Sequence, residues 1–290
     1  MNSTSKGTEF YLKQSLRCGN KILNIAKPLV MGILNITPDS FYAGSRYARY
    51  ESWMAAAKQM LVEGAAILDV GAASSRPGAA IVSEDEELRR LIPVVEELAI
   101  TFPDAVISVD TYRAAVAARA VESGAHIIND ISAGELDPAM FETIAGLRVP
   151  YIMMHMQGTP NHMQTNPVYK DVVGDIKTYF EHRLEKLNHY GAVDVWLDPG
   201  FGFGKTIFHN YEILRRLNEF SSFGLPVVTG LSRKSMIYKV LDSKPEDALT
   251  GTNVLHTLAL LNGANMLRVH DVREAVETIM LMEAYKNKPV

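Results

Sequence analysis

The stretch that decides the fold reads Met31-Gly32-Ile33-Leu34-Asn35-Ile36-Thr37-Pro38-Asp39-Ser40-Phe41. Its apolar first half ends abruptly at Asn35, and a polar segment with a proline follows. This pattern is typical of a buried parallel strand that delivers one side chain into a site and continues as a loop. Seven further segments repeat it. The strand and loop are therefore predicted to form one wall and the lid of a shared site.

From Leu29 onwards, strand-like and helix-like segments alternate. The strand interiors are continuously apolar, which indicates a parallel sheet buried on both faces. The predicted strands are Val30–Asn35, Ile67–Gly71, Val106–Asp110, His126–Asn129, Tyr151–His155, Val195–Asp198, Val227–Thr229 and Met266–Val269.

Eight strand–helix units in about 260 residues match the usual size of a (β/α)8 barrel. We therefore predict an α/β protein with a single (β/α)8 TIM barrel at residues 30–290 and an N-terminal arm or hairpin at residues 1–29. A doubly wound open sheet is the alternative. No Gly-x-Gly-x-x-Gly follows the first strand, which disfavours that alternative.

Several helices have recognisable ends in the sequence. The predicted helices run from Glu84 to about Ala99, over Arg113–Ser123, over Tyr169–Tyr190 and over Asp247–Asn262. The first should open with a capping box at Ser83–Glu86 and be kinked by Pro93. The second and fourth should each end at a glycine. Tyr169–Tyr190 is predicted to be the longest helix, and Asp271–Glu274 resembles a second capping box.

Composition excludes several classes of protein. The chain has 290 residues, of which 47% are hydrophobic and 21% charged, as expected of a globular protein. Its net charge of -4 gives no reason to expect nucleic-acid binding. The single cysteine, Cys18, excludes an internal disulfide and fits a reducing compartment. No apolar run approaches the roughly 20 residues of a membrane span, and Met1–Glu9 lacks the apolar core of a signal peptide. A cytoplasmic protein without membrane partners is predicted.

Polar side chains stand where the predicted strands end, which is where the active sites of (β/α)8 barrels lie. This ring comprises Asn35, Asp69, Asp110, Asn129, Met154 with His155, Asp198, the Gly230–Ser235 segment, and Arg268 with His270. A single residue of this kind is more often a helix cap or a loop anchor. Eight strands that all end in this way predict a functional site.

Three segments near the ring carry further candidates. Ser74–Gly78 is either a plain turn or a loop that covers an anion or substrate. Asp198–Thr206 lacks the spacing of a nucleotide P-loop. Its glycines are predicted to let the backbone pass close to a flat ligand, with Phe201 and Phe203 as apolar walls. Gly230–Ser235 follows the seventh strand, the usual phosphate-binding region of this fold, and its two cations and two hydroxyls suit an anion.

Seven motifs resemble the signatures of the dihydropteroate synthase family. In order, they are Gly32–Phe41, Ser75–Gly78, Ile128–Asp130, Met154–Gly158, Asp198–Lys205, Ser232–Ser235 and Arg268–Asp271. Each is weak alone, but together they are specific. The resemblance implies a transferase of folate biosynthesis. It would condense 6-hydroxymethyl-7,8-dihydropterin diphosphate with 4-aminobenzoate to give 7,8-dihydropteroate and diphosphate, by a dissociative substitution in which Mg2+ assists departure of the diphosphate.

The resemblance also implies roles for individual residues. Pterin binding would fall to Asp110, Asn129, Met154, Asp198 and Lys234. Diphosphate binding would fall to Asn35 as the Mg2+ ligand, Arg76, Arg268 and His270. The aminobenzoate, and sulfonamide inhibitors that mimic it, would contact Phe41, Ser75, Pro77, Phe203, Lys234 and Ser235. The catalytic residues would be Asn35, Asp110, Lys234, Arg268 and His270.

The second loop departs from the family pattern Gly-Gly-x-Ser-Thr-Arg-Pro-Gly, because Ser75 replaces the threonine. The hydroxyl is kept and a methyl is lost, so sulfonamide sensitivity stays open. Two alternative functions remain. A methyltetrahydrofolate-dependent methyltransferase with a pterin pocket would not need the anion-binding set. A non-catalytic barrel that binds a pterin or phosphate would need neither Asn35 nor Asp110. The family also implies a homodimer, with the last helices as the predicted interface.

Overall fold

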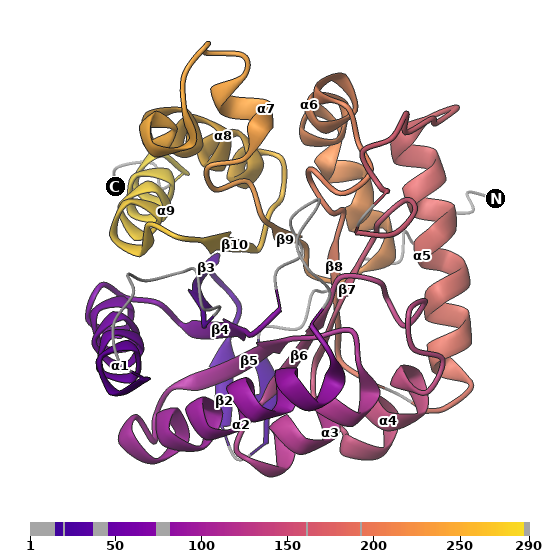
Figure 1. Ribbon diagram of the computed structural model, residues 1–290. Coiled ribbons are helices and arrows are strands. Elements are labelled where there is room, and N and C mark those ends of the chain that lie inside the picture. The colour runs from indigo at the N-terminus through magenta and orange to yellow at the C-terminus, as the bar shows by residue number, and fades with distance from the viewer. Residues whose placement is uncertain are drawn as a thin grey trace, which may run out of the picture.

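The computed structural model describes residues 15–19, 21–36, 46–73, 82–160, 162–191 and 193–286. Its centre is a nearly closed barrel of parallel strands surrounded by helices (Figure 1). The strands are β3 (Leu29–Asn35), β4 (Ile67–Gly71), β5 (Val106–Asp110), β6 (Ile127–Asp130), β7 (Tyr151–Met154), β8 (Val195–Asp198), β9 (Val228–Thr229) and β10 (Met266–Val269).

The strand order is β8-β7-β6-β5-β4-β3-β10-β9, and a parallel bridge between Leu197 and Val227 closes the ring. This closure confirms the predicted (β/α)8 barrel and excludes the open sheet. The predicted strand limits agree with the structure to within one residue at each end.

Alternate residues of each strand face the inside of the barrel. The layer near the strand starts is apolar and consists of Met31, Ile67, Val106, Ile127, Ile152, Trp196, Val228 and Met266. Two positions further along the strands stand Ile33, Asp69, Ser108, Asn129, Met154, Asp198 and Arg268. The inside of the barrel therefore changes from apolar to polar towards the strand ends.

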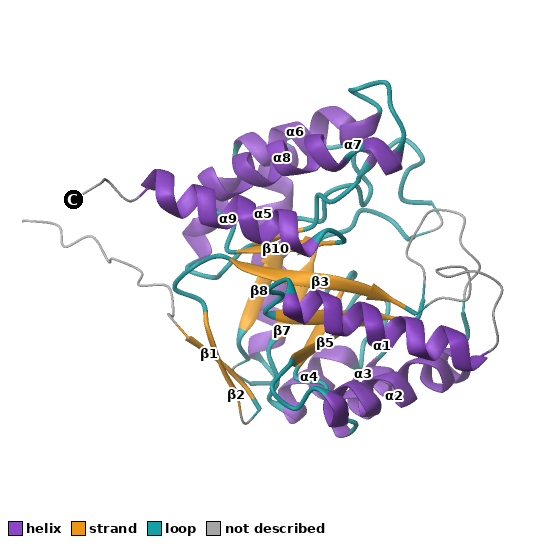
Figure 2. Ribbon diagram, turned by 90° about the vertical axis from the view of Figure 1, so that its left-hand side faces the viewer, coloured by secondary structure: helices purple, strands orange, loops and turns teal. Residues whose placement is uncertain are grey.

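A hairpin of β1 (Ser15–Cys18) and β2 (Lys21–Asn24) closes the apolar end of the barrel. Figure 2 shows it beside the strand starts, away from the end to which β3 points. Leu16, Cys18 and Leu23 pack against the apolar layer. Burial raises the pKa of the Cys18 thiol to about 12, so this cysteine is a core residue and a poor nucleophile.

The helices pack outside the strands. They are α1 (Arg46–Val62), α2 (Glu84–Thr101), α3 (Ala114–Glu122), α4 (Met140–Leu147), α5 (Val172–Asn188), α6 (Ile207–Arg215), α7 (Ser235–Tyr238), α8 (Leu249–Leu261) and α9 (Val272–Lys286), with 3-10 turns η1 (Leu217–Phe223) and η2 (Pro245–Asp247). None of the helices in the described ranges is both long and apolar enough to cross a membrane.

Three details of the helix predictions are wrong. Helix α5 has 17 residues and α2 has 18, so α5 is not the longest. The capping box of α2 is only half formed: Ser83 accepts from the N–H of Glu86, but the Glu86 carboxylate pairs with Arg89 and Arg90. The carboxylate of Asp271 likewise pairs with an arginine instead of capping α9.

Candidate functional site at the strand ends

Four side chains from four strands form one hydrogen-bonded network inside the barrel mouth. Asp69 Oδ2 accepts from Asn129 Nδ2 at 3.1 Å and from Arg268 Nε at 2.6 Å. Arg268 Nη2 donates to Asp110 Oδ2 at 2.7 Å. Four of the strand-end residues predicted from the sequence are thus brought together. Their individual roles in binding or catalysis stay predictions.

This network concentrates charge where solvent screening is weak. Burial raises the pKa of Asp110 to about 7, an effect that the neighbouring Arg268 opposes and the negative Asp69 reinforces. Burial alone would lower the pKa of Arg268, but Asp69 and Asp110 outweigh it and the pKa is raised. Arg268 is therefore a permanent cation whose two neighbouring carboxylates hold it in place.

In the strand register, Gly71 of β4 pairs with Asn35 of β3 on one side and with Asp110 of β5 on the other. A methyl group placed on Gly71 would lie 3.7 Å from Asn35 Oδ1 and 3.8 Å from Asp110 Oδ2. The two oxygens thus lie on either side of the position of Gly71. Amide and carboxylate oxygens are ligands that Mg2+ accepts. In the described part of the chain no group of three or more His, Cys, Asp or Glu could hold a metal. The amide oxygen of Asn35 therefore fits Mg2+ as a single protein ligand, and the ion itself stays a prediction.

Asp198 and Lys234 form the opposite side of the mouth. Asp198 Oδ1 accepts from the N–H of Gly200 at 2.8 Å, and burial raises the pKa of this carboxyl although Lys234 opposes the effect. Lys234 donates to the carbonyl of Phe201 and lies 4.9 Å from the centre of the Phe203 ring. Burial lowers the pKa of Lys234 to about 8. The pair offers a fixed acceptor and a fixed donor to a ligand.

Apolar side chains line the mouth next to this pair. Met154 is buried in a small cluster with Ile131, Met156 and Met163, against which Phe203 packs while partly exposed. A flat ring bound between the polar groups would meet an apolar wall here. The predicted contacts of Met154 and Phe203 with a ligand stay predictions.

The expectation for the glycine-rich segment is wrong for Phe201, and two of its glycines have a structural role. Phe201 is fully buried in the outer core and lines no site. Gly200 and Gly204 have positive φ angles of 71° and 63°, and a methyl group on them would lie 1.9 Å from the His155 carbonyl oxygen and 2.4 Å from that of Gln157. Gly200 and Gly204 therefore let two loops approach each other. A methyl group on Gly202 would instead lie 3.4 Å from the Lys234 side chain, and the predicted approach of the backbone to a flat ligand stays a prediction there.

Lys205, which follows those glycines, is buried beneath the loop. Its ammonium donates to the carbonyls of Gly200 and Phe203, both at 2.9 Å, and lies 2.9 Å from His155 Nδ1. Burial lowers the pKa of Lys205 well below its usual value and also that of His155. Lys205 thus ties the loop that carries Phe203 to β7, a role that the sequence did not reveal.

The Ser232–Ser235 segment contributes fewer anion-binding groups than predicted. Arg233, at a φ of 54°, makes two 2.8 Å hydrogen bonds to the Asp271 carboxylate and donates to the Glu246 carbonyl at 2.8 Å. Its charge is therefore directed away from the mouth. Ser232 Oγ accepts from the His270 N–H at 3.2 Å and lies 3.0 Å from Nδ1 of the same residue. Ser235 is the first residue of α7.

Four predicted site residues lie outside the described part of the chain: Phe41, Ser75, Arg76 and Pro77. Their predicted roles towards the diphosphate and the aminobenzoate stay predictions.

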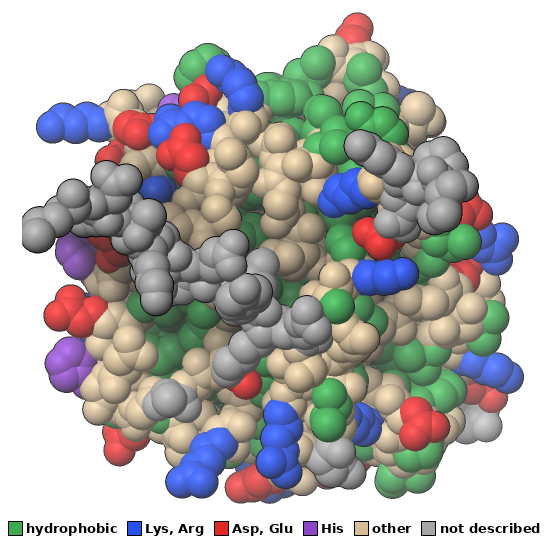
Figure 3. All heavy atoms as spheres, turned by 180° about the vertical axis from the view of Figure 1, so that it is seen from behind, with side chains coloured by type: hydrophobic (Ala, Val, Ile, Leu, Met, Phe, Trp, Pro, Cys, Tyr) green, Lys and Arg blue, Asp and Glu red, His purple; other side chains and the backbone are tan. Residues whose placement is uncertain are grey.

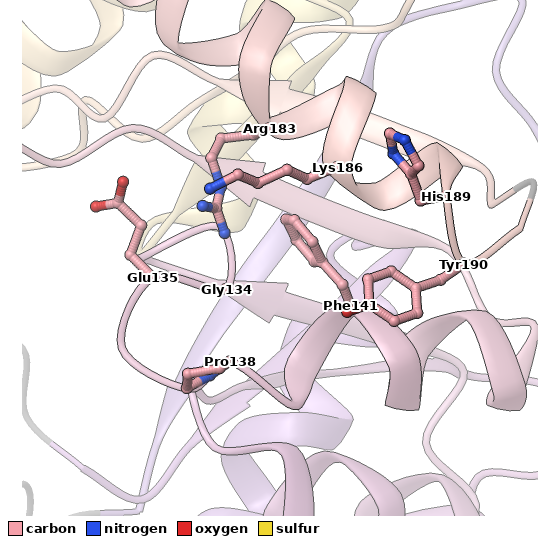
Figure 4. Close-up of a pocket in the computed structure, with 8 residues that line it drawn as sticks. All are labelled: Gly134, Glu135, Pro138, Phe141, Arg183, Lys186, His189 and Tyr190. Carbon is pink, nitrogen blue, oxygen red and sulfur yellow. The ribbon is translucent and has the colours of Figure 1, made fainter.

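A separate surface pocket of about 790 Å³ lies on the outside of the barrel between the α4 region and α5 (Figure 4). It contains none of the strand-end residues. Its most buried cation, Arg183, donates to the carbonyl of Ala133 at 2.8 Å and lies 4.6 Å from the centre of the Phe141 ring. Because Arg183 is engaged in holding the chain together, the barrel mouth is the better candidate site.

Comparison with known proteins shows the family to which this chain belongs. The model of the pterin binding enzyme family matches residues 31–270, from the middle of β3 to just beyond β10. The match spans well over half of the chain. The chain belongs to the family of pterin-binding enzymes.

Within that family, the chain is similar to dihydropteroate synthases. It is 45% identical over 264 residues to the dihydropteroate synthase of Escherichia coli K12, covering 90% of this chain and 93% of that protein. A Yersinia pestis dihydropteroate synthase with a sulfonamide drug superposes with a TM-score of 0.88 at 43% identity, covering 94% and 99% of the two chains. A Xanthomonas albilineans dihydropteroate synthase with 7,8-dihydropteroate superposes with a TM-score of 0.86 at 36% identity, covering 95% and 100%.

Proposed function

We propose that this protein is a dihydropteroate synthase, which joins 6-hydroxymethyl-7,8-dihydropterin diphosphate to 4-aminobenzoate and releases 7,8-dihydropteroate and diphosphate. The observation that carries the proposal is the juxtaposition, in a barrel related to known dihydropteroate synthases, of Asn129, Asp110 and Arg268. One mouth thus holds groups for a hydrogen-bonding ring, a developing cation and an anion.

The pterin head group presents an edge of adjacent donors and acceptors. Asp198 supplies acceptors, Asn129 supplies its amide oxygen as an acceptor, and Lys234 supplies a donor. Met154 and Phe203 cover the ring faces. In this orientation the pterin methylene points towards Asp110, which lies nearer the strand ends than Asn129 and Asp69.

Catalysis then consists mainly of stabilising charge in a fixed geometry. As the bond from the methylene carbon to the diphosphate oxygen breaks, positive charge grows on the pterin and negative charge on the leaving group. Asp110 faces the first and Arg268 with His270 the second. The amine of 4-aminobenzoate is neutral at pH 7, so its nitrogen forms the new bond without a strong general base and loses its proton to solvent.

We propose that Asn35 holds Mg2+ together with diphosphate oxygens and water. The support is the hard amide oxygen of Asn35 at the end of β3, whose Oδ1 would lie 3.7 Å from a methyl group on Gly71. When bound, the ion would neutralise charge on the departing diphosphate. Asn35→Ala is expected to lower turnover more than pterin affinity, and the reverse pattern would contradict this role.

One assay tests the main proposal. Purified protein is incubated with the pterin diphosphate, 4-aminobenzoate and Mg2+, and both diphosphate and 7,8-dihydropteroate are quantified. The two products should appear in equal amounts and only when all three components are present. Tight pterin binding without product would support a non-catalytic barrel. Methyl transfer from methyltetrahydrofolate without diphosphate release would support the methyltransferase.

We propose that the protein acts as a homodimer through α8 and α9. Val254, Leu258 and Leu261 share one face of α8 and are 55%, 40% and 49% exposed, and Met280 and Leu281 of α9 are 66% and 73% exposed. Figure 3, seen from behind, shows hydrophobic side chains gathered at the upper right, on the side of α7 to α9. Light scattering should give twice the mass of the chain, and Leu258→Asp should give the monomer. A wild-type monomer would refute the proposal.

With one buried cysteine, Cys18, we also propose a cytoplasmic location.

A further inference from the structure

Asp69 is the least exposed carboxylate of the barrel mouth. It lies on β4 in register with Ile33 and Ser108, and its exposed fraction is 0%. One oxygen, Oδ2, accepts from both Asn129 and Arg268, while Oδ1 has no partner among the described residues. A carboxylate this deeply buried cannot touch a ligand in the mouth, so any effect it has on the reaction acts through its two neighbours.

The chemistry of these bonds fixes the orientation of Asn129. An ionised carboxylate only accepts hydrogen bonds, so the amide atom facing Asp69 must be the nitrogen. Asn129 Oδ1 is then the atom left for the mouth, and it accepts from no described residue. Without Asp69, the amide could rotate by half a turn and present its NH2 group to the ligand instead.

The same oxygen fixes Arg268. Its Nε donates to Asp69 and its Nη2 to Asp110, which sets the plane of the guanidinium. Its Nη1 donates to none of the described residues and remains for an anion. Asp69 is thus the common acceptor that couples the head-group subsite to the anion subsite.

We propose that Asp69 is a positioning residue, which holds Asn129 with its oxygen towards the pterin and Arg268 with Nη1 towards the diphosphate. The inference rests on the proposed function, because it refines the same site. It assigns to Asp69 no contact with substrate. The proposal predicts that substitution of Asp69 weakens ligand binding because Asn129 and Arg268 lose their orientation.

Binding of 6-hydroxymethylpterin, which lacks the diphosphate, tests the link to Asn129. Asp69→Leu removes the acceptor but keeps a side chain branched at Cγ, and should raise the Kd roughly 10- to 100-fold. Asp69→Asn keeps an oxygen that can accept both bonds and should recover most of the affinity. Ser108→Ala is the matched control, since it changes the neighbouring buried residue in the register, and should bind like wild type. If Asp69→Leu does not fold, Asp69→Ser, whose short side chain cannot reach both partners, replaces it.

A double-mutant cycle separates positioning from a general packing effect. In an Asn129→Ala background, Asp69→Leu should raise the Kd for 6-hydroxymethylpterin by less than about threefold, since its partner is already absent. Equal effects in both backgrounds, or a Kd for Asp69→Leu within twofold of wild type, would overturn the inference. Wild-type protein that fails to bind 6-hydroxymethylpterin would instead refute the proposed function, so the two failures are distinct.

Discussion

Arg268 Nη2 and Asp110 Oδ2 lie 2.7 Å apart at the mouth of the barrel, with 21% and 18% of the two side chains exposed. The pair is accessible enough for a ligand to meet both charges. In the proposed reaction the two charges face opposite ends of one breaking bond. Asp110 therefore stabilises a charge that develops only as the bond breaks, which is the condition for a large effect on turnover. Arg268 faces a group that is already anionic in the substrate and becomes more so, and it therefore contributes to binding as well.

Asp110→Asn should show this directly. The amide keeps the size of the side chain but removes the negative charge that faces the developing cation. Turnover should fall by about 100- to 1,000-fold, with a smaller loss of pterin affinity. Single-turnover rates and the Kd for the pterin diphosphate measure the two effects. Asp242→Asn, the same change at an exposed position, should leave both unchanged. A mutant with normal turnover would remove Asp110 from the mechanism.

The pH dependence of kcat/KM should be bell-shaped. Burial raises the pKa of Asp110 to about 7, so its charge is lost as the pH falls through 7. Burial lowers the pKa of Lys234 to about 8, so its charge is lost as the pH rises through 8. Activity should be highest between these values, measured from about pH 5.5 to 9.5. Lys234→Arg stays protonated throughout this range and should lose the basic limb while keeping the acidic one. An unchanged basic limb would exclude Lys234 as its source.

Asp198→Asn should weaken pterin binding. The carboxylate offers only acceptors, whereas the amide places donors against donors of the pterin edge or loses the hydrogen bond from Gly200. The Kd for 6-hydroxymethylpterin should rise roughly 10- to 100-fold, as measured by calorimetry. Asp242→Asn again serves as the matched control. Unchanged affinity would mean that the pterin lies in another orientation.

The strands and the ring of polar groups were predictable because a buried parallel strand is a continuous apolar run that ends at a polar residue. Ile67–Gly71 and Val106–Asp110 show this pattern and match the structure at both ends. Asp69 entered the ring for the same reason. Its link to Asn129 did not follow, since a sequence pattern gives strand position but not the distance between side chains 60 residues apart.

Side chains outside the strands were harder to predict because their directions depend on distant partners. Arg233 stands beside Lys234 in the sequence, yet it faces Asp271, 38 residues away. Arg183 lies on α5 among charged residues, yet it is buried and donates to the carbonyl of Ala133. Sequence spacing alone could not separate these structural cations from those of the mouth.

Arg233→Ala should therefore act mainly on stability and on the placement of Lys234. It removes the two-pronged contact with Asp271 and leaves the Glu246 carbonyl without this donor. The free energy of unfolding should fall by about 1.5–3 kcal/mol, seen as a lower melting temperature. Arg215→Ala, which loses an exposed pair with Glu212, should change it by less than about 1 kcal/mol. Equal effects of the two substitutions would show that the Arg233 contact contributes no more to the free energy of unfolding than an exposed ion pair.

Lys205→Met should loosen the loop that carries Phe203. Lys205 is 3% exposed, and its ammonium donates to the carbonyls of Gly200 and Phe203, which would lose their donor inside the protein. Each unsatisfied carbonyl costs about 1–3 kcal/mol, so the melting temperature should fall by several degrees. Since Phe203 is predicted to contact the aminobenzoate, the KM for that substrate should rise more than the KM for the pterin diphosphate. Lys58→Met, at an exposed position of α1, should change neither. An equal rise in both KM values would show that Lys205 supports the barrel as a whole and not this loop in particular.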